Sequence, residues 1–221
     1  MFRPFHCVVG ALSLMAAACY DHSNFNQVGS FATVRLVNAT DTPVSLANAG
    51  VLDSGNARLV FGQSSSCVFV TLSHALIDGI AITNGGTGAT IPLAASLKSG
   101  DNVIIVAFGD SVGNIQLTTL DNHFVPAANS AGLRFFNGTS STAPLLMHRN
   151  DLTLTSFVGL GSASSFVSVP IDPGTITFSD KLSVVLDAGV MAFPLGQNST
   201  VVLGPPAPAA VPLRFFTVQA C

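Results

Sequence analysis

The stretch ATVRLVNAT at residues 32–40 decides the fold, because it returns as AGLRFFNGT at residues 131–139. The two copies share a small residue, an aliphatic residue, Arg, two apolar residues, Asn, a small residue and Thr, in the same order. Arg35 and Arg134 lie 99 positions apart (134 − 35 = 99). A repeat at a fixed offset of this size indicates two tandem copies of one small module.

Two further matches extend the repeat. The offset of 99 places residues 61–70 over residues 160–169 without a gap, and residues 213–218 overlay residues 115–120 at an offset of 98. Each copy then has about the common size of a domain. We therefore predict two domains, at residues 31–123 and 124–221.

The composition favours strands over helices. Hydrophobic residues make up 48% of the chain and charged residues 9%, and every acidic residue is Asp. Glu is absent and Lys is scarce, although these residues commonly fill exposed helix faces. Val, Ile, Thr and Phe are abundant, and 20 Gly and 12 Pro interrupt them. This mixture is typical of short strands joined by turns.

Turn-forming residues divide each copy into short apolar runs. The strands predicted in the first copy are residues 32–38, 44–47, 58–62, 67–72, 79–83, 102–108 and 114–120. Those predicted in the second are residues 132–137, 145–148, 152–158, 165–169, 175–178, 182–186, 200–203 and 211–218. Seven or eight short strands per copy predict an all-β chain of two antiparallel β-sandwich domains.

The N-terminus has the pattern of an export signal. Arg3 precedes an apolar run at residues 5–18 that is too short to span a bilayer, so residues 1–18 are predicted to be a signal peptide. The sequence MAAAC at residues 15–19 fits ordinary Ala-x-Ala cleavage and also a bacterial lipobox, in which Cys19 becomes the lipidated first residue. The polar residues 19–30 would form a tether.

The cysteine count favours the lipidated form. Cys7 leaves with the signal, and the mature chain keeps Cys19, Cys67 and Cys221, an odd number in an oxidising compartment. A bond between Cys67 and Cys221 would leave Cys19 for lipid, and closing a loop of about 150 residues would contribute ~5 kcal/mol. The alternative is that both are free thiols buried as small apolar side chains.

Several segments resemble a known family. They are LDN at residues 120–122, Pro126 and Ala127, AGLRFFN at residues 131–137, and VRLVNA at residues 34–39. Together they are similar to domain of unknown function 4397, in which a strand ending in Leu-x-Asp leads through Pro and small residues to a strand of the form Val-Arg-apolar-apolar-Asn-Ala.

This resemblance covers essentially the whole mature chain. It implies tandem immunoglobulin-like sandwiches on exported, often lipid-anchored bacterial envelope proteins, with no catalytic residues to carry over. The sequence departs from the family at residues 39–41, where Ser-Pro is frequent, and at residues 44–47, where an Asp is frequent. These departures weaken the inference of a shared ligand and leave the fold expectation intact.

The repeated Arg and Asn residues require a physical reason. In the structural interpretation, which we favour, Arg35 and Arg134 lie along the sheet and bond loop carbonyls or an Asp such as Asp121. In the functional interpretation they contact an anion or a glycan. Asn38 and Asn137 are expected to hold the following turn through bonds to nearby backbone. Core or interdomain packing is expected for Phe135, Phe136, Phe215 and Phe216, which if exposed would form a docking patch.

One motif suggests catalysis. Residues 109–113, GDSVG, satisfy Gly-x-Ser-x-Gly and resemble the first block of Gly-Asp-Ser esterases, with Ser111 as the nucleophile. Such an elbow needs a following helix, an oxyanion hole and a His base brought near by an Asp. The chain after Ser111 instead reads as a strand, and neither His123 nor His148 has the Asp-x-x-His arrangement of those esterases. A β-turn is the better interpretation.

Metal and cofactor sites are not expected. The candidate donors are His74, His123, His148, Asp78, Asp121 and Asp151, together with the pairs Asp101 with Asn102 and Asp110 with Asn114. They show neither His-x-x-x-His nor Cys-x-x-Cys spacing, nor the carboxylate spacing of a calcium loop. Nucleic acid binding is disfavoured by the net charge of −3 with 8 Lys and Arg.

These observations predict a noncatalytic cell-envelope lipoprotein with a structural, adhesive or ligand-binding role. Its lipid on Cys19 would hold it at the outer membrane or periplasmic face, with another envelope protein or a glycan as partner. The alternative is a secreted module that binds glycans or peptides, which needs an exposed aromatic groove although the chain has no Trp and one Tyr. A secreted esterase using Ser111 comes third.

Overall fold

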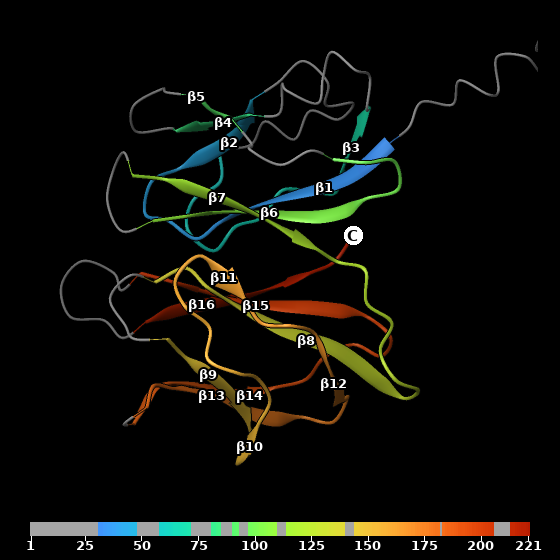
Figure 1. Ribbon diagram of the computed structural model, residues 1–221, viewed down its shortest axis with the longest axis vertical. Coiled ribbons are helices and arrows are strands. Elements are labelled where there is room, and N and C mark those ends of the chain that lie inside the picture. The colour runs from blue at the N-terminus through green and yellow to red at the C-terminus, as the bar shows by residue number, and fades with distance from the viewer. Residues whose placement is uncertain are drawn as a thin grey trace, which may run out of the picture.

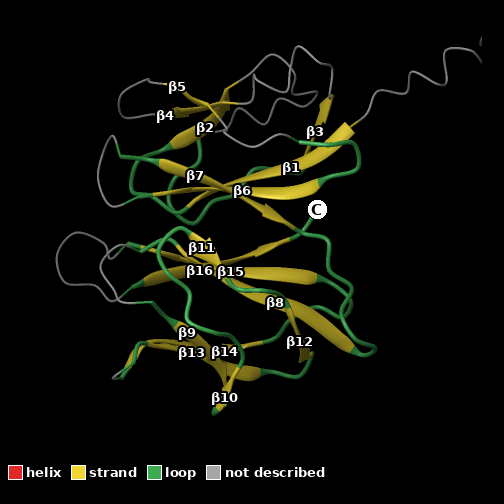
Figure 2. Ribbon diagram, in the orientation of Figure 1, coloured by secondary structure: helices red, strands yellow, loops and turns green. Residues whose placement is uncertain are grey.

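The computed structural model describes residues 31–47, 58–71, 81–84, 90–92, 97–109, 114–139, 144–181, 183–205 and 213–221. Within these ranges all regular secondary structure is strand, as Figure 2 shows. The described residues contain no helix of the length and apolar character that a membrane span requires. The predicted all-β sandwich fold is confirmed. The predicted signal peptide, the tether with Cys19, and Ser111 lie outside the described residues.

The first half of the chain builds two sheets. Its strands are β1 (Phe31–Asn38), β2 (Val44–Ala47), β3 (Val68–Thr71), β4 (Ala81–Asn84), β5 (Thr90–Pro92), β6 (Asn102–Phe108) and β7 (Gln116–Asp121). One sheet has the order β3-β1-β6-β7 and the other the order β2-β4-β5. A buried apolar cluster that includes Val34, Leu36 and Ile105 fills the first half.

The second half repeats this plan. Its strands are β8 (Ser130–Asn137), β9 (Leu146–Arg149), β10 (Leu152–Thr153), β11 (Ser162–Ala163), β12 (Val167–Pro170), β13 (Gly174–Ser179), β14 (Val184–Met191), β15 (Asn198–Gly204) and β16 (Arg214–Gln219). One sheet has the order β11-β8-β15-β16, with β12 also paired to β8, and the other the order β10-β9-β13-β14. We call residues 31–121 module 1 and residues 130–221 module 2.

The registers of the two modules correspond. Thr33 of β1 lies opposite Asn102 of β6, and Gly132 of β8, 99 positions later, lies opposite Asn198 of β15. The pairing of β6 with β7 in module 1 has the same register as the pairing of β15 with β16 in module 2. Among the described strands, every sheet takes all its members from one module.

One feature of the predicted sandwich is corrected. The sheets were expected to be antiparallel, but β1 runs parallel to β6 and β8 runs parallel to β15. Parallel neighbours need a long crossover connection. In module 1 the sheet β2-β4-β5 and the strand β3 supply this crossover, and in module 2 the sheet β10-β9-β13-β14 and the strands β11 and β12 supply it. The first strand of each module therefore lies beside a strand that begins about 60 residues after the first strand ends.

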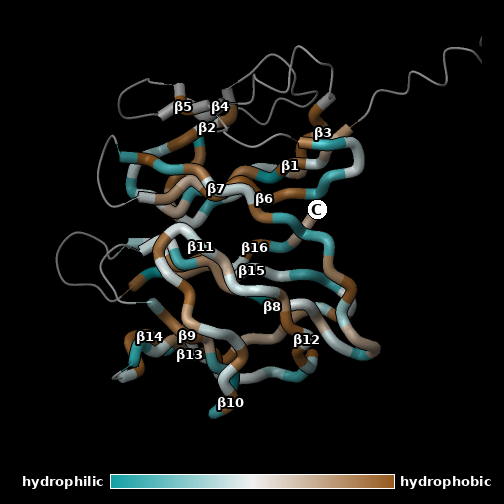
Figure 3. The backbone as a smooth tube through the Cα atoms, viewed as in Figure 1, coloured by the Kyte–Doolittle hydropathy of each residue, from teal (hydrophilic) through white to brown (hydrophobic). Residues whose placement is uncertain are grey.

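The four sheets stack as layers (Figure 1), in the order β2-β4-β5, β3-β1-β6-β7, β11-β8-β15-β16 and β10-β9-β13-β14. The middle two layers, which we call the inner sheets, face each other. Their central strands are covered on both faces, so β6 and β15 are apolar in consecutive runs and not only at alternate positions, as the brown segments of Figure 3 illustrate.

Some predicted strands differ from those observed. Residues 58–62 were predicted to be a strand, but only Leu59 forms a bridge, to Val44, and a turn follows at Phe61 and Gly62. Gly62 has a φ of 81°, which interrupts an extended strand. The predicted strand at residues 152–158 shortens to β10, and the one at residues 182–186 extends to Met191 in β14.

Candidate functional site at the contact between the modules

The inner sheets meet through a buried apolar cluster, which we call the interface cluster. Its buried members are Val37, Ala39, Ile104, Val106, Phe108 and Leu120 of module 1 and Phe136, Val202 and Val218 of module 2. The rings of Phe108 and Phe136 pack edge to face with centroids 5.3 Å apart. Because all of these side chains are at most 7% exposed, the modules exclude water from the contact.

Both modules use the same face in this contact. The strand registers make Val37 equivalent to Phe136, Val106 to Val202, and Leu120 to Val218, and all six belong to the interface cluster. A surface that meets its own equivalent is the arrangement of a two-fold symmetric dimer. The contact therefore resembles a homodimer interface built within one chain.

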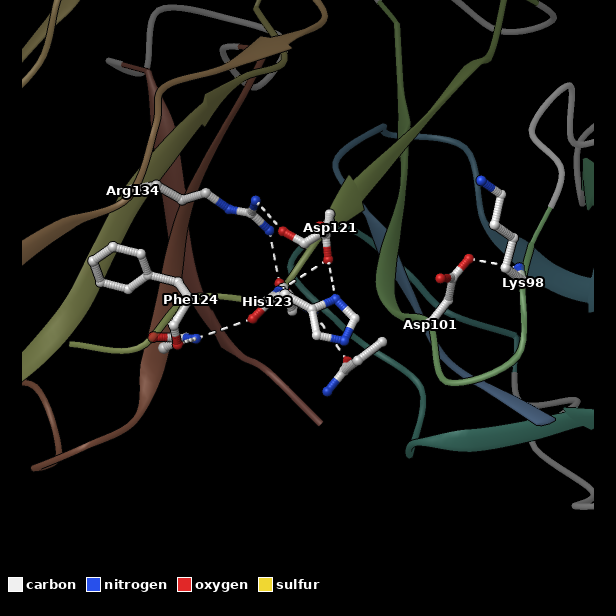
Figure 4. Close-up of polar contacts among 9 residues, drawn as sticks. Lys98, Asp101, Asp121, His123, Phe124 and Arg134 are labelled. Atoms are coloured by element: carbon white, nitrogen blue, oxygen red, sulfur yellow. Dashed lines mark hydrogen bonds and ion pairs between the residues drawn. The ribbon is translucent and has the colours of Figure 1, made fainter. Parts of the chain in front are cut away.

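Arg134 crosses this contact from β8. Its Nη1 donates to the carbonyl of Asp121 at 2.6 Å, its Nη2 to Oδ1 of Asn122 at 2.7 Å, and its Nε to Oγ1 of Thr200 at 3.0 Å. Figure 4 shows the side chain directed at the end of β7. The guanidinium also lies 4.2 Å from the ring centroid of Phe166. Burial lowers the pKa of Arg134 to about 10, while the charge of Asp121 opposes the shift.

Arg35 crosses in the opposite direction and has poorer partners. Its Nη1 donates to the carbonyl of Gln219 at 2.7 Å, and Gln219 is the equivalent of Asp121. Its Nη2 lies 2.9 Å from Sγ of Cys67. The Nε atom is buried and has no acceptor among the described residues. Burial lowers the pKa of Arg35.

A disulfide joins the modules beside Arg35. Cys67 and Cys221 are bonded, with Cα atoms 5.8 Å apart and a sequence separation of 154 residues. The predicted disulfide is therefore present, and it brings the end of the sequence against module 1, as the C label in Figure 1 indicates. Cys67 is half-buried and Cys221 is exposed.

Aromatic packing takes the equivalent place on the other side of the contact. Phe166 is the equivalent of Cys67 at the offset of 99, and His123 is the equivalent of Cys221 at the offset of 98. The rings of Phe124 and Phe166 stack with centroids 5.1 Å apart. One side of the contact thus has a covalent bond where the other has stacked rings.

His123 and Asp121 form a pair at the module connector. The Nδ1 of His123 lies 2.6 Å from Oδ1 of Asp121, and the side chains are 58% and 71% exposed. The hydrogen bond and charge of Asp121 raise the pKa of His123. For Asp121, slight desolvation raises the pKa, but the hydrogen bonds and charge of His123 outweigh it, so the net pKa is lowered.

Asn38 and Asn137 are fully buried at the end of the first strand of each module. The Nδ2 of Asn38 donates to the carbonyl of Leu59, and that of Asn137 to the carbonyl of Val158. Their Oδ1 atoms accept from the backbone N–H groups of the residues two positions later, Thr40 and Thr139. Each Asn therefore links the turn that follows it to a second segment of its own module.

The four Phe residues singled out in the sequence lie in packing positions. Phe135 belongs to the core of module 2, Phe136 to the interface cluster, and the partly buried Phe215 and Phe216 pack against that core and that cluster respectively. Phe193 and Phe215 line a groove of about 450 Å³, together with polar residues such as Ser199 and Thr217, beside β16, the edge strand of its sheet.

The described side chains offer little catalytic chemistry. The Nε2 of His148 lies 2.6 Å from Oγ of Ser179, and its Nδ1 lies 3.1 Å from Oγ1 of Thr153. A Ser–His pair with a hydroxyl in place of an orienting carboxylate is a weak base and nucleophile set. Within the described ranges, no three His, Cys, Asp or Glu side chains are grouped as metal ligands. His74, Asp78 and Asp110 lie outside those ranges, while Asp101 accepts a bond from the backbone N–H of Lys98.

The sequence did not predict most of the residues that accept hydrogen bonds from Arg35 and Arg134. Thr200 and Gln219 belong to no quoted motif, and the registers of β15 and β16 bring them to the guanidinium groups. Asn122 belongs to the LDN segment at residues 120–122, but the sequence did not link it to Arg134. The exchange of Cys67 for Phe166 is readable in the alignment of residues 61–70 with residues 160–169. That exchange is the sequence signal that the two sides of the contact differ.

No protein-family model matches this chain, and comparison with curated proteins finds no similar sequence. The resemblance to domain of unknown function 4397 and the immunoglobulin-like classification remain predictions from the quoted motifs.

Proposed function

We propose that this protein is an exported, noncatalytic component of a bacterial cell envelope, anchored by lipid on Cys19, in which two β-sandwich modules act as one rigid structural or adhesive unit. The observation that carries the proposal is the disulfide between Cys67 and Cys221 across the module contact. Disulfides of this kind persist in exported proteins and are rare in the cytosol. The bond thus agrees with the export signal expected at residues 1–18.

The module contact supports a structural role. Domains joined by a small polar contact usually move relative to each other, whereas a large apolar contact holds them fixed. Here the interface cluster, the two crossing Arg side chains and the disulfide act together. A unit that keeps its shape suits a spacer or an adhesive stalk on a cell surface.

The anchor is tested by expressing the full chain in a bacterium and measuring the intact mass and the membrane fraction. We expect a mature protein that begins at a lipid-modified Cys19 and sediments with membranes, and a Cys19→Ser variant that becomes soluble. A mature wild-type chain without lipid would contradict the anchor. The absence of the Cys67 to Cys221 bond as well would remove the basis of the whole proposal.

The noncatalytic assignment has its own test. We expect no hydrolysis of a nitrophenyl ester above the background rate. Hydrolysis that disappears on Ser111→Ala or on Ser179→Ala would instead establish an esterase, because these serines belong to the Gly-x-Ser-x-Gly motif and to the His148 pair.

Peptide binding is the second candidate, and the groove beside β16 favours it. An extended peptide can add a strand to a sheet edge and place alternate side chains in an adjacent groove. NMR titration with a Val-Thr hexapeptide should then shift the signals of Phe215 and Thr217, which line the groove, and a chitin trisaccharide should not. Unchanged spectra with the hexapeptide would remove this candidate.

A further inference from the structure

The two crossing Arg residues are equivalent in sequence but differ in what they contact. All three donor groups of Arg134 described above reach oxygen acceptors. At the equivalent positions around Arg35, Ile104 replaces Thr200 and Ala220 replaces Asn122. Arg35 consequently keeps one carbonyl partner, the Gln219 carbonyl, and otherwise contacts the sulfur of Cys67.

This environment leaves the charge of Arg35 poorly compensated. A disulfide sulfur is a weak hydrogen-bond acceptor, and the buried Nε has no acceptor among the described residues. No carboxylate of the described residues forms an ion pair with Arg35. A half-buried guanidinium in such a position is stabilised by any anion that appears beside it. The group able to become an anion there is Cys67, as a thiolate.

We propose that the Cys67 to Cys221 bond is a reversible clasp that an external dithiol opens, with Cys67 leaving as a thiolate held by Arg35. Thiols beside Arg have lowered pKa values, and thiols of lower pKa leave faster in exchange. This property adds a redox response to the structural role proposed above and does not depend on the lipid anchor.

The geometry also selects the sulfur that is attacked. Cys221 is exposed, whereas Cys67 is half-buried with its sulfur beside Arg35. A polar cavity of about 360 Å³ lies beside Cys221, and Asn102, Asn198 and Gln219 are among the residues that line it. Cys221 lines this cavity and Cys67 does not, so a small dithiol bound there meets Cys221 first, and Cys67 becomes the leaving group.

Opening of the disulfide takes two exchange steps. The incoming thiolate forms a bond to Sγ of Cys221, the bond between the two protein sulfurs breaks, and its electron pair leaves with Cys67 beside Arg35. The second thiolate of the dithiol then attacks the dithiol sulfur that is bonded to Cys221. This releases Cys221 as a thiolate, which takes a proton from water. The dithiol is oxidised to its cyclic disulfide, and the protein disulfide is reduced by two electrons.

The first test measures the pKa of the Cys67 thiol directly. The full chain carrying Cys7→Ser, Cys19→Ser and Cys221→Ser has Cys67 as its only thiol, and the pH dependence of its alkylation by iodoacetamide gives the pKa. We expect a pKa at least about one below the usual value near 8.5. Arg35→Gln should raise the pKa by about one, whereas Arg35→Lys should keep most of the shift.

Arg134→Gln is the matched control, because it removes the equivalent guanidinium from the side of the contact that has no sulfur. It should leave the pKa of the Cys67 thiol unchanged. A pKa near 8.5 in the parent chain, or equal changes from Arg35→Gln and Arg134→Gln, would overturn the proposal.

The second test uses the intact disulfide and so does not require that the Cys221→Ser variant fold. Arg35→Gln should slow opening of the bond by dithiothreitol about threefold, if the leaving thiol responds to pKa with a Brønsted coefficient of roughly 0.5, as attacking thiols do. Peptide mass spectrometry after a brief exposure to a monothiol should find the mixed disulfide on Cys221. An unchanged rate, or a mixed disulfide on Cys67, would contradict the mechanism.

Discussion

At the scale of single residues, the surroundings of a side chain decide its role more than its place in a motif. Arg35 and Arg134 occupy equivalent positions, yet Arg134 is 5% exposed with oxygen partners and an aromatic ring, whereas Arg35 is half-buried beside sulfur. The repeat indicated that both Arg residues have a role. It could not predict which Arg has the better hydrogen-bond partners, because those partners include residues of strands far away in the sequence.

The two Arg residues should therefore differ in their contribution to stability. We expect Arg134→Met to lower the free energy of unfolding by about 3 kcal/mol, because Oδ1 of the buried Asn122 and Oγ1 of the buried Thr200 lose the guanidinium that donates to them. Arg35→Met should lower it by about 1 kcal/mol, since one carbonyl bond is lost. Urea unfolding of both variants measures the difference. Equal losses would contradict the assigned contacts.

The connector pair should titrate in a predictable direction. The pKa of His123 is raised above its usual 6.5 by Asp121, so the pair stabilises the fold below pH 6.5 and loses that contribution as the pH rises through the pKa in the folded state. Both side chains are largely exposed, which keeps the contribution below about 1 kcal/mol. NMR titration should show the pKa of His123 falling toward 6.5 in Asp121→Asn. An unchanged pKa would mean that the pair does not form in solution.

At the scale of elements, sequence patterns identify some of the residues that form turns but not all of the contacts that these residues make. The Asn that ends β1 and β8 holds the next turn, as expected from the sequence. Its bonds to Leu59 and Val158, which were not predicted, also join it to segments 21 residues away. Residues 58–62 looked like a strand because Leu59, Val60 and Phe61 form an apolar run. They form a bridge and a turn, since the φ of Gly62 ends the extended run.

Gly62 and Gly161 form a matched pair for testing these turns. Both have positive φ, 81° and 71°, and an L-residue there costs about 1 to 2 kcal/mol. A Cβ on Gly161 would also lie 2.7 Å from Cζ of Phe108, whereas one on Gly62 meets nothing closer than 3.8 Å. Gly161→Ala should thus lower the free energy of unfolding by about 3 kcal/mol and Gly62→Ala by about 1 kcal/mol. Thermal or urea unfolding checks this, and a larger loss at Gly62 would contradict the packing of Phe108.

At the scale of the whole molecule, two sandwiches form one stack of four layers (Figure 1). Composition and spacing were sufficient to predict strands, sandwiches and a repeat, because these depend on local alternation and turn chemistry. Packing between the domains was also expected, but the parallel pairing of β1 with β6 and the identity of the faces that meet could not be predicted, because they depend on which distant strands share a register. The disulfide was predicted by counting cysteines, while its neighbour Arg35 was not linked to it.

The Cys67 to Cys221 disulfide should contribute strongly to the free energy of unfolding. A bond between residues separated by 154 positions restricts the unfolded chain, and the chain-entropy relation gives about 5 kcal/mol. Urea unfolding of the Cys7→Ser, Cys19→Ser chain, with and without added Cys67→Ser and Cys221→Ser, measures this contribution. We expect a loss of about 3 to 5 kcal/mol in the chain without the bond. A loss below about 1 kcal/mol would show that the unfolded chain is compact or that the bond strains the fold.

The face-to-face arrangement of the modules is tested most directly by peptide mapping of the exported protein without reduction. We expect one linked pair of peptides containing Cys67 and Cys221, which the sequence separates by 154 positions and the module contact brings together. A map in which Cys67 is linked to Cys19, or in which Cys67 and Cys221 are both alkylated as free thiols, would contradict it.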